Sequence, residues 1–298
     1  MTAAPAMSPL LRATGFALLA TACFACVNLS VRALSLGGLP TLEIVFLRSA
    51  VSLMAVAPWV ARVGARGLRT GIFRLHLLRC VILGGGTVLW FAGLGMLPLG
   101  DALALQFTTP LWVAVLAAVL LREKVDLARW AVIATGFAGV LVIVRPGLGG
   151  AALGQGAAFV LAGAALYACH TVIMKPMART EGGGTMVFYL NGMYFLFFGL
   201  FMPFVWVMPG VGQLGWLALL GICGALSHVF LTRALHLADA SFVAPFDFLK
   251  LPFGASLAWV LFGDVSDIWT WVGAAIIIAA GYLNARAEGR RRAAEPGG

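Results

Sequence analysis

The chain has 298 residues, of which 62% are hydrophobic and only 10% are charged, and it carries a formal net charge of +9. A soluble domain is about 45–50% apolar and about 25% charged. The composition therefore excludes an ordinary soluble enzyme and a disordered chain, and it predicts an integral membrane protein. Ten helical spans of about 20 residues each would use about two thirds of the chain, which leaves no room for a separate soluble domain such as an ATPase.

The predicted elements are all helical, because the apolar runs are too long for membrane strands and lack their alternating pattern. Charge-free stretches and turn residues divide the chain into ten spans. They lie near residues 10–31, 41–60, 77–97, 101–121, 128–145, 153–174, 186–207, 214–235, 241–262 and 268–285. The long charge-free run at 182–232 is divided in two because proline and glycine at 209–212 interrupt it.

Lysine and arginine predict how these spans are oriented, because cytoplasmic loops carry an excess of both. With the N-terminus inside, all but four of the 20 basic residues fall on the cytoplasmic side, and Arg79 is counted among them. Only Arg32 and Arg145 fall on the opposite side, and two more lie inside spans. Both termini are therefore predicted to be cytoplasmic, with the basic tail 286–298 anchored at anionic headgroups. This placement explains the net charge without nucleic acid.

The two halves of the sequence resemble each other. Phe24-Ala25-Cys26 matches Tyr167-Ala168-Cys169 at an offset of 143, and residues 97–102 match residues 235–240 at an offset of 138. At similar offsets Arg32 aligns with Lys175, and Glu123 aligns with Asp264. The sequence therefore predicts an internal repeat.

Each predicted repeat contains five spans, which is an odd number, so the second repeat must be inverted relative to the first. We expect the first repeat at residues 10–145 and the second at residues 153–285. Inverted repeats are typical of secondary transporters, which bind substrate near the membrane midplane between the two halves.

Several motifs resemble a known family. They are Phe46-Leu47-Arg48, the stretch from Leu97 through Thr109-Pro110 to Arg122-Glu123-Lys124, and the stretch from Ala244-Pro245-Phe246 to Leu261-Phe262-Gly263-Asp264. The sequence is similar to the drug/metabolite transporter superfamily, in its ten-helix EamA type with two repeats. The family usually has glutamate where Asp264 stands. The resemblance implies transport by a carrier, and it leaves the substrate open among amino acids, nucleobases, riboflavin and S-adenosylmethionine.

Polar residues inside the spans are the candidate substrate-binding residues, since such groups need partners or water within the membrane. They are Asn28, Arg48, Trp90, Gln106, Thr109, Tyr167, His170, Asn191, Tyr194, His228, Asp247 and Lys250. The fifth and tenth spans have almost no such residues, so the other eight are expected to surround a wet cavity. Each candidate also has a structural alternative, such as a bond between helices, aromatic packing or a satisfied core histidine.

Glycine and proline mark two further features. Pro110, Pro245 and Pro252 interrupt equivalent spans of the two halves, which points to a binding site or a gate, although harmless kinks stay open. The run Gly84-Gly85-Gly86 is not a phosphate loop, because no lysine with serine or threonine follows it. Close packing of helices is the expected role.

The predicted function is a secondary transporter of the bacterial inner membrane that works by alternating access, as a monomer or weak dimer, without cofactor or metal. Arg48 and Lys250 outnumber the single anion Asp247, which favours an amino acid or another carboxylate-bearing substrate. The alternative is a larger metabolite such as riboflavin, a nucleobase or S-adenosylmethionine. Proton coupling through Asp247, His170 or His228 stays open. A membrane-embedded enzyme and a passive channel are less favoured, because no catalytic cluster or selectivity filter is visible.

Overall fold

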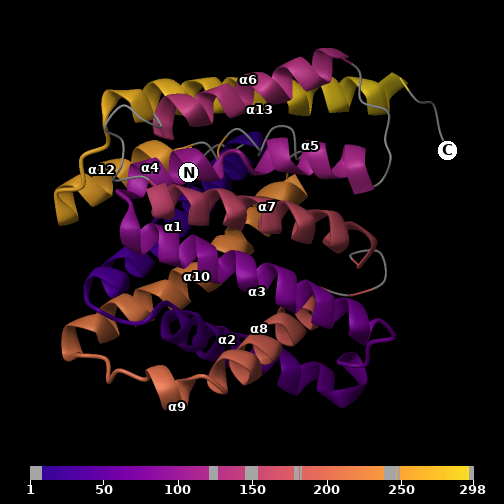
Figure 1. Cartoon of the computed structure of the whole chain (residues 1–298). Helices are drawn as coiled ribbons and strands as arrows, with labels where there is room; N and C mark the ends of the chain where they lie inside the picture. Colours follow the sequence, from indigo (N-terminus) through magenta and orange to yellow (C-terminus); the bar gives the residue numbers. More distant parts are fainter. Residues whose placement is uncertain are drawn as a thin grey trace, which may run out of the picture.

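The computed structural model describes residues 9–120, 127–144, 154–177, 181, 183–237, 246 and 249–294. Within these ranges all regular structure is helical. The helices are α1 (Pro9–Leu36), α2 (Thr41–Gly67), α3 (Phe73–Met96), α4 (Leu99–Gln106), α5 (Thr109–Leu120), α6 (Leu127–Val144), α7 (Gly154–Met177), α8 (Gly183–Gly199), α9 (Met202–Val205), α10 (Val211–Leu237), α12 (Lys250–Phe262) and α13 (Ile268–Ala294) (Figure 1).

Among the described residues, five helices are long and apolar enough to cross a membrane by length and composition: α1, α2, α3, α7 and α10. Shorter apolar stretches lie in α6, α12 and α13. Every predicted span overlaps one of the helices or a pair of them. The structure therefore confirms the prediction of an all-helical membrane protein.

Two predicted spans are each divided between two helices. The span expected at 101–121 consists of α4 and α5, which are separated by Phe107 and Thr108. Pro110 is the second residue of α5, where the missing N–H of proline costs nothing. Thr109 and Thr108 each donate a hydroxyl hydrogen bond to a carbonyl oxygen three residues earlier, at 2.7 and 2.8 Å. The span with the predicted interruption at Pro110 is thus divided between two helices, and Pro110 lies in the first turn of the second.

The other predicted interruptions have different outcomes. Pro252 is the third residue of α12, so it lies in the first turn and does not break that helix. Pro245 lies outside the described residues. The second divided span is the one expected at 186–207, where α8 ends at Gly199 and the short α9 follows.

The helices of the two halves pack against each other in pairs. α1 packs on α10, α3 on α7, α2 on α8, α4 on α12, and α6 on α13 (Figure 1). The spans of the first half are α1, α2, α3, α4–α5 and α6, and those of the second are α7, α8–α9, α10, α12 and α13. Exchanging the halves converts the α1–α10 pair into the α7–α3 pair and leaves the other pairs unchanged, as a twofold relation between them requires.

Glycines allow two of these pairs to approach closely. In the α3–α7 pair, a Cβ atom on Gly86 would lie 3.1 Å from Leu166 Cβ, and one on Gly163 would lie 3.2 Å from the Gly86 carbonyl oxygen. In the α6–α13 pair, a Cβ atom on Gly273 would lie 2.6 Å from the carbonyl oxygen of Gly139. Gly86 therefore has the packing role that we expected for the glycine run.

Candidate transport site

A cluster of three hydroxyl groups joins three helices near their middles. Thr87 of α3 places its Oγ1 atom 3.4 Å from the phenolic oxygen of Tyr167 of α7, and 3.4 Å from that of Tyr194 of α8. Thr87 and Tyr194 are only 2% and 4% exposed. Gly84 makes room for the Tyr194 ring, since a Cβ atom there would lie 3.4 Å from Tyr194 Cε1.

The donors in this cluster can be assigned. The Thr87 hydroxyl donates its one hydrogen to the carbonyl oxygen of Leu83, at 2.8 Å. Its two lone pairs are then free to accept from both tyrosines. Each phenol consequently donates to Thr87 and keeps its own oxygen lone pairs as acceptors. The cluster can thus accept hydrogen bonds from a ligand.

Replacing Thr87 by valine is expected to lower the free energy of unfolding by about 1–3 kcal/mol, because two buried phenols lose their acceptor. The measurement is thermal unfolding of the purified protein in detergent. Thr135→Val on α6 is the matched control, since Thr135 is exposed and its hydroxyl bonds only within its own helix. Equal stability of the two variants would contradict the assigned hydrogen bonds.

One cation of α2 lies close to the hydroxyl cluster and to an aromatic ring of α3. Arg48 of α2 is half-buried, and its guanidinium carbon lies 5.7 Å from the centre of the Phe91 ring, within the range of a cation–π contact. Arg48 also interacts electrostatically with Tyr194. Trp90 is buried on the same helix as Phe91. The structure therefore brings four predicted site residues, Arg48, Trp90, Tyr167 and Tyr194, to α2, α3, α7 and α8.

Arg79, which the charge pattern assigned to the cytoplasmic side, also lies in a helix close to this region. It is the seventh residue of α3 and is buried. Its Nε atom donates to Nε2 of His170 at 3.0 Å, and its Nη1 atom donates to the carbonyl oxygen of Met186 at 3.3 Å. The predicted site residue His170 is therefore an acceptor for a buried guanidinium.

Several other predicted residues make local contacts. Asn191 donates to the carbonyl oxygen of Val187 within α8, at 2.9 Å, and Thr109 bonds to Gln106 across the α4–α5 break. Asn28 is buried in α1. These contacts fit the structural alternative for Asn191 and Thr109.

The predicted site in the ninth span is only partly described. Lys250 is the first residue of α12, and its Nζ atom lies 4.3 Å from the centre of the Phe24 ring of α1. Asp247 lies outside the described residues, so the structure does not test its expected ion pair with Lys250. His228 belongs to α10, but its side chain is not among those described.

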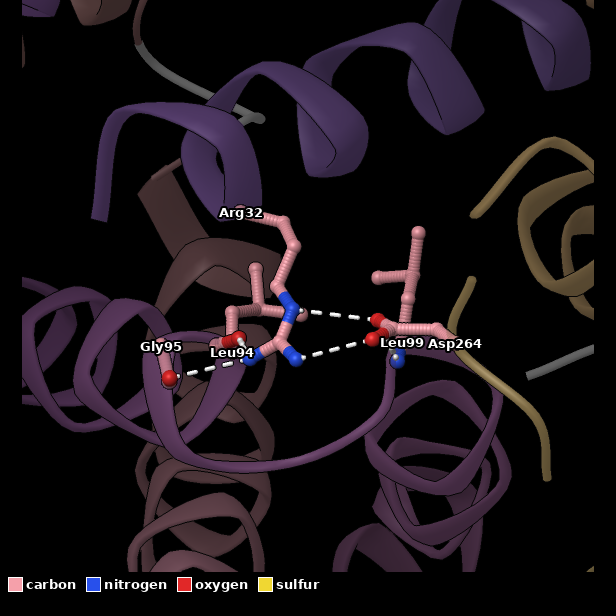
Figure 2. Close-up of polar contacts among 5 residues, drawn as sticks. All are labelled: Arg32, Leu94, Gly95, Leu99 and Asp264. Atoms are coloured by element: carbon pink, nitrogen blue, oxygen red, sulfur yellow. Dashed lines mark hydrogen bonds and ion pairs between the residues drawn. The ribbon is translucent and has the colours of Figure 1, made fainter. Parts of the chain in front are cut away.

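At one end of the bundle, an ion pair joins the two halves (Figure 2). Arg32 donates from Nε and Nη2 to the two carboxylate oxygens of Asp264, both at 3.1 Å, and from Nη1 to the carbonyl oxygens of Leu94 and Gly95, both at 2.9 Å. Asp264 also accepts from the backbone N–H of Leu99, at 3.3 Å. One pair thus ties the end of α1 to the α3–α4 turn and to the loop before α13.

More contacts between the halves lie on the same side as the Arg32 pair. The carboxylate of Glu43 accepts from the backbone N–H of Val207 at 3.0 Å, and Gln213 donates to the carbonyl oxygen of Gly37 at 2.8 Å. Glu43 is buried in the first turn of α2, where an acidic residue is favoured by the helix dipole.

The opposite end of the bundle is also joined across the halves. Thr70, between α2 and α3, donates to the carboxylate of Glu181, between α7 and α8. The Tyr189 hydroxyl donates to the carbonyl oxygen of Leu68 at 2.7 Å. His76 stacks on Tyr189 with ring centres 4.7 Å apart, and its Nε2 atom lies 4.0 Å from Glu181 Oε1. Contacts between the halves therefore lie at both ends, with the hydroxyl cluster between them.

Comparison with known proteins assigns the family. The EamA-like transporter family matches the chain twice, at residues 11–145 and 154–286. The chain belongs to this family. It is therefore a transporter rather than an enzyme, and a multi-pass protein of the inner membrane.

The EamA-like transporter is similar to curated bacterial carriers. It is 35% identical to a protein of Vibrio cholerae named riboflavin transporter, over 81% of each chain, and 32% identical to one of that name from Brucella anthropi, over 92% of this chain and 99% of the relative. It is 30% identical to the S-adenosylmethionine uptake transporter of Rickettsia prowazekii, over 81% of this chain and 82% of the relative. A solved crystal structure has the same fold, with a TM-score of 0.60 at 19% identity, covering 93% of this chain and 98% of its own.

Proposed function

We propose that this EamA-like transporter carries a planar heterocyclic metabolite of the riboflavin type across the inner membrane by alternating access. The observation that carries the proposal is the hydroxyl cluster of Thr87, Tyr167 and Tyr194. Beside it, Arg48 interacts with Tyr194 and lies over the Phe91 ring. A flat, largely apolar ring with polar edges matches such surroundings, because aromatic side chains stack on it and phenols bond to its edges. Two relatives named riboflavin transporters support the same substrate.

The amino-acid interpretation has less support. It assigned the substrate carboxylate to Lys250 or Arg48. Both cations lie over aromatic rings, Lys250 at Phe24 and Arg48 at Phe91. The names of the relatives also favour the alternative of a larger metabolite.

The proposed mechanism uses the contacts at the two ends in turn. The ion pair of Arg32 and Asp264 closes one end, and the contacts of Thr70 and Glu181 close the other. Opening either set gives the hydroxyl cluster access to one side of the membrane. In this proposal the termini and the tail 286–298 are cytoplasmic, the repeats at 10–145 and 153–285 move against each other, and the protein acts as a monomer or weak dimer.

Uptake of radiolabelled riboflavin tests the substrate and its coupling. The protein is expected to raise uptake well above vector background in a bacterium that cannot make riboflavin and lacks its own carrier. Proteoliposomes with and without a pH gradient then show whether protons drive it. A matched variant, Tyr194→Phe, is expected to accumulate normally and to transport less, since it lacks one phenol. Uptake at background level, with the protein present in the membrane, would contradict the proposal.

A further inference from the structure

Arg79 is a buried cation that the hydroxyl cluster does not require. It is 5% exposed and lies in the second turn of α3. Arginine stays charged in proteins, and a charge within a membrane span is costly and is usually kept for function. In the described part of the chain, no carboxylate lies within ion-pair distance of it. Its charge therefore lacks a counter-ion among these residues.

The acceptors that Arg79 does have are both neutral. One is the carbonyl oxygen of Met186, and the other is Nε2 of His170. Because Nε2 accepts, His170 is uncharged with its hydrogen on Nδ1. A guanidinium has five N–H groups, and these two bonds occupy one on Nε and one on Nη1. The contacts fix the plane of the guanidinium while leaving the Nη2 side without a partner among the described residues.

Glu181 interacts with His76, as Arg79 does, but this acid has its own partners. Glu181 accepts the Thr70 hydroxyl and lies 4.0 Å from His76. His76 is also buried, and it lies one helical turn before Arg79. Glu181 therefore belongs to the closing contacts at the end of the bundle, and the acceptor for Arg79 has to come from elsewhere.

Arg79 lies on the same side of α3 as the hydroxyl cluster. Arg79, Leu83, Thr87 and Trp90 recur at spacings of three and four residues and are all buried. Arg79 and Thr87 are eight residues apart, which is about 12 Å along the helix axis. His170 and Tyr167 of α7 face the two positions in the same order. A fused-ring ligand could therefore contact both groups at once.

We propose that Arg79, oriented by His170, binds the carbonyl edge of the substrate. This inference rests on the proposed function and specifies the ligand class as a heterocycle with two adjacent acceptors, such as a carbonyl oxygen beside an unprotonated ring nitrogen. The guanidinium fork matches two adjacent acceptors. The same cation disfavours a sulfonium compound such as S-adenosylmethionine, because like charges repel strongly in a site of low dielectric constant.

The test compares two ligands in two proteins. Uptake of riboflavin and of 2-thioriboflavin, in which sulfur replaces the carbonyl oxygen at C2 of the ring, is measured for the unmodified protein and for Arg79→Gln. We expect the unmodified protein to prefer riboflavin by about 10–100-fold in KM, and the variant to lose that preference, since a hydrogen bond to a charged group is lost. Arg74→Gln is the control, because Arg74 lies on the same helix and is exposed. Arg79→Lys keeps the charge without the fork, and it replaces Arg79→Gln if that variant does not accumulate.

Each outcome is decisive. If the variant prefers riboflavin as strongly as the unmodified protein does, the role of Arg79 is wrong and the proposed function stands. If the unmodified protein takes up S-adenosylmethionine instead of riboflavin, both are wrong. If it transports neither, the proposed function is wrong, and thermal stabilisation of the purified proteins by lumichrome decides the role of Arg79. Stabilisation of the unmodified protein but not of the variant supports that role, and any other result overturns it.

Discussion

Replacing Arg32 by alanine is expected to lower the free energy of unfolding by about 3–5 kcal/mol, because it leaves a largely buried carboxylate without its cation. The change also removes the donor to the carbonyl oxygens of Leu94 and Gly95, which end α3. Asp264→Ala should cost less, since Arg32 then keeps those two carbonyl acceptors. Thermal unfolding of the purified variants in detergent measures both effects.

The double variant lacking both Arg32 and Asp264 separates the ion pair from the carbonyl contacts. Its loss of stability is expected to be smaller than the sum of the single losses, since no unpaired charge remains. Arg12→Ala is the control, because Arg12 is exposed on the same helix. Additive losses would show that the two side chains do not interact and that Arg32 acts only through α3.

The second large effect is expected at Gly273. Replacing it by alanine places a Cβ atom 2.6 Å from the carbonyl oxygen of Gly139 and 2.5 Å from Cγ1 of Ile143. A backbone atom cannot move aside alone, so α13 has to separate from α6. Overpacking of this kind costs about 1–3 kcal/mol, which we expect to appear as lower yield and a lower midpoint of thermal unfolding.

A glycine in open space gives the control for Gly273. Gly215 lies on α10, and outside the adjacent backbone of that helix no atom lies within 4 Å of the position of its Cβ. Gly215→Ala is expected to be neutral or stabilising by up to about 1 kcal/mol, because alanine favours a helix more than glycine does. If both variants lose the same stability, the close contact of α6 and α13 is not what limits substitution at Gly273.

The sequence predicts much of the fold because hydropathy and turn residues act locally. The ten spans and the break at Pro110 follow from runs of a few residues. The pairing of helices across the halves agrees with the internal repeat. The repeat aligns Arg32 with Lys175 and Asp264 with Glu123, so the ion pair of Arg32 and Asp264 joins two positions that the repeat relates to a second cation and a second acid. Local patterns do not predict which residues of the two halves contact each other. Arg32 and Asp264 are 232 positions apart, and no local pattern joins them.

The site was predicted less completely for the same reason. Tyr167 and Tyr194 could be named because polar groups stand out in apolar spans, but their common partner Thr87 depends on how α3, α7 and α8 pack. Arg79 was missed because an arginine near a span end is usually in a loop. A search for an arginine on the same helical face as a polar cluster would have found it.

The contacts at the two ends of the bundle also bear on the energetics of the transport cycle. Glu43 follows the first span of one half and Glu181 follows the first span of the other, and each carboxylate accepts a hydrogen bond from the opposite half. Breaking either contact exchanges one such bond for water. These two bonds offset each other, and the Arg32 pair stabilises the closed form of its own end in addition. The state that is open at the opposite end should therefore be the more populated one, whereas the direction of net transport follows the concentrations of the substrate.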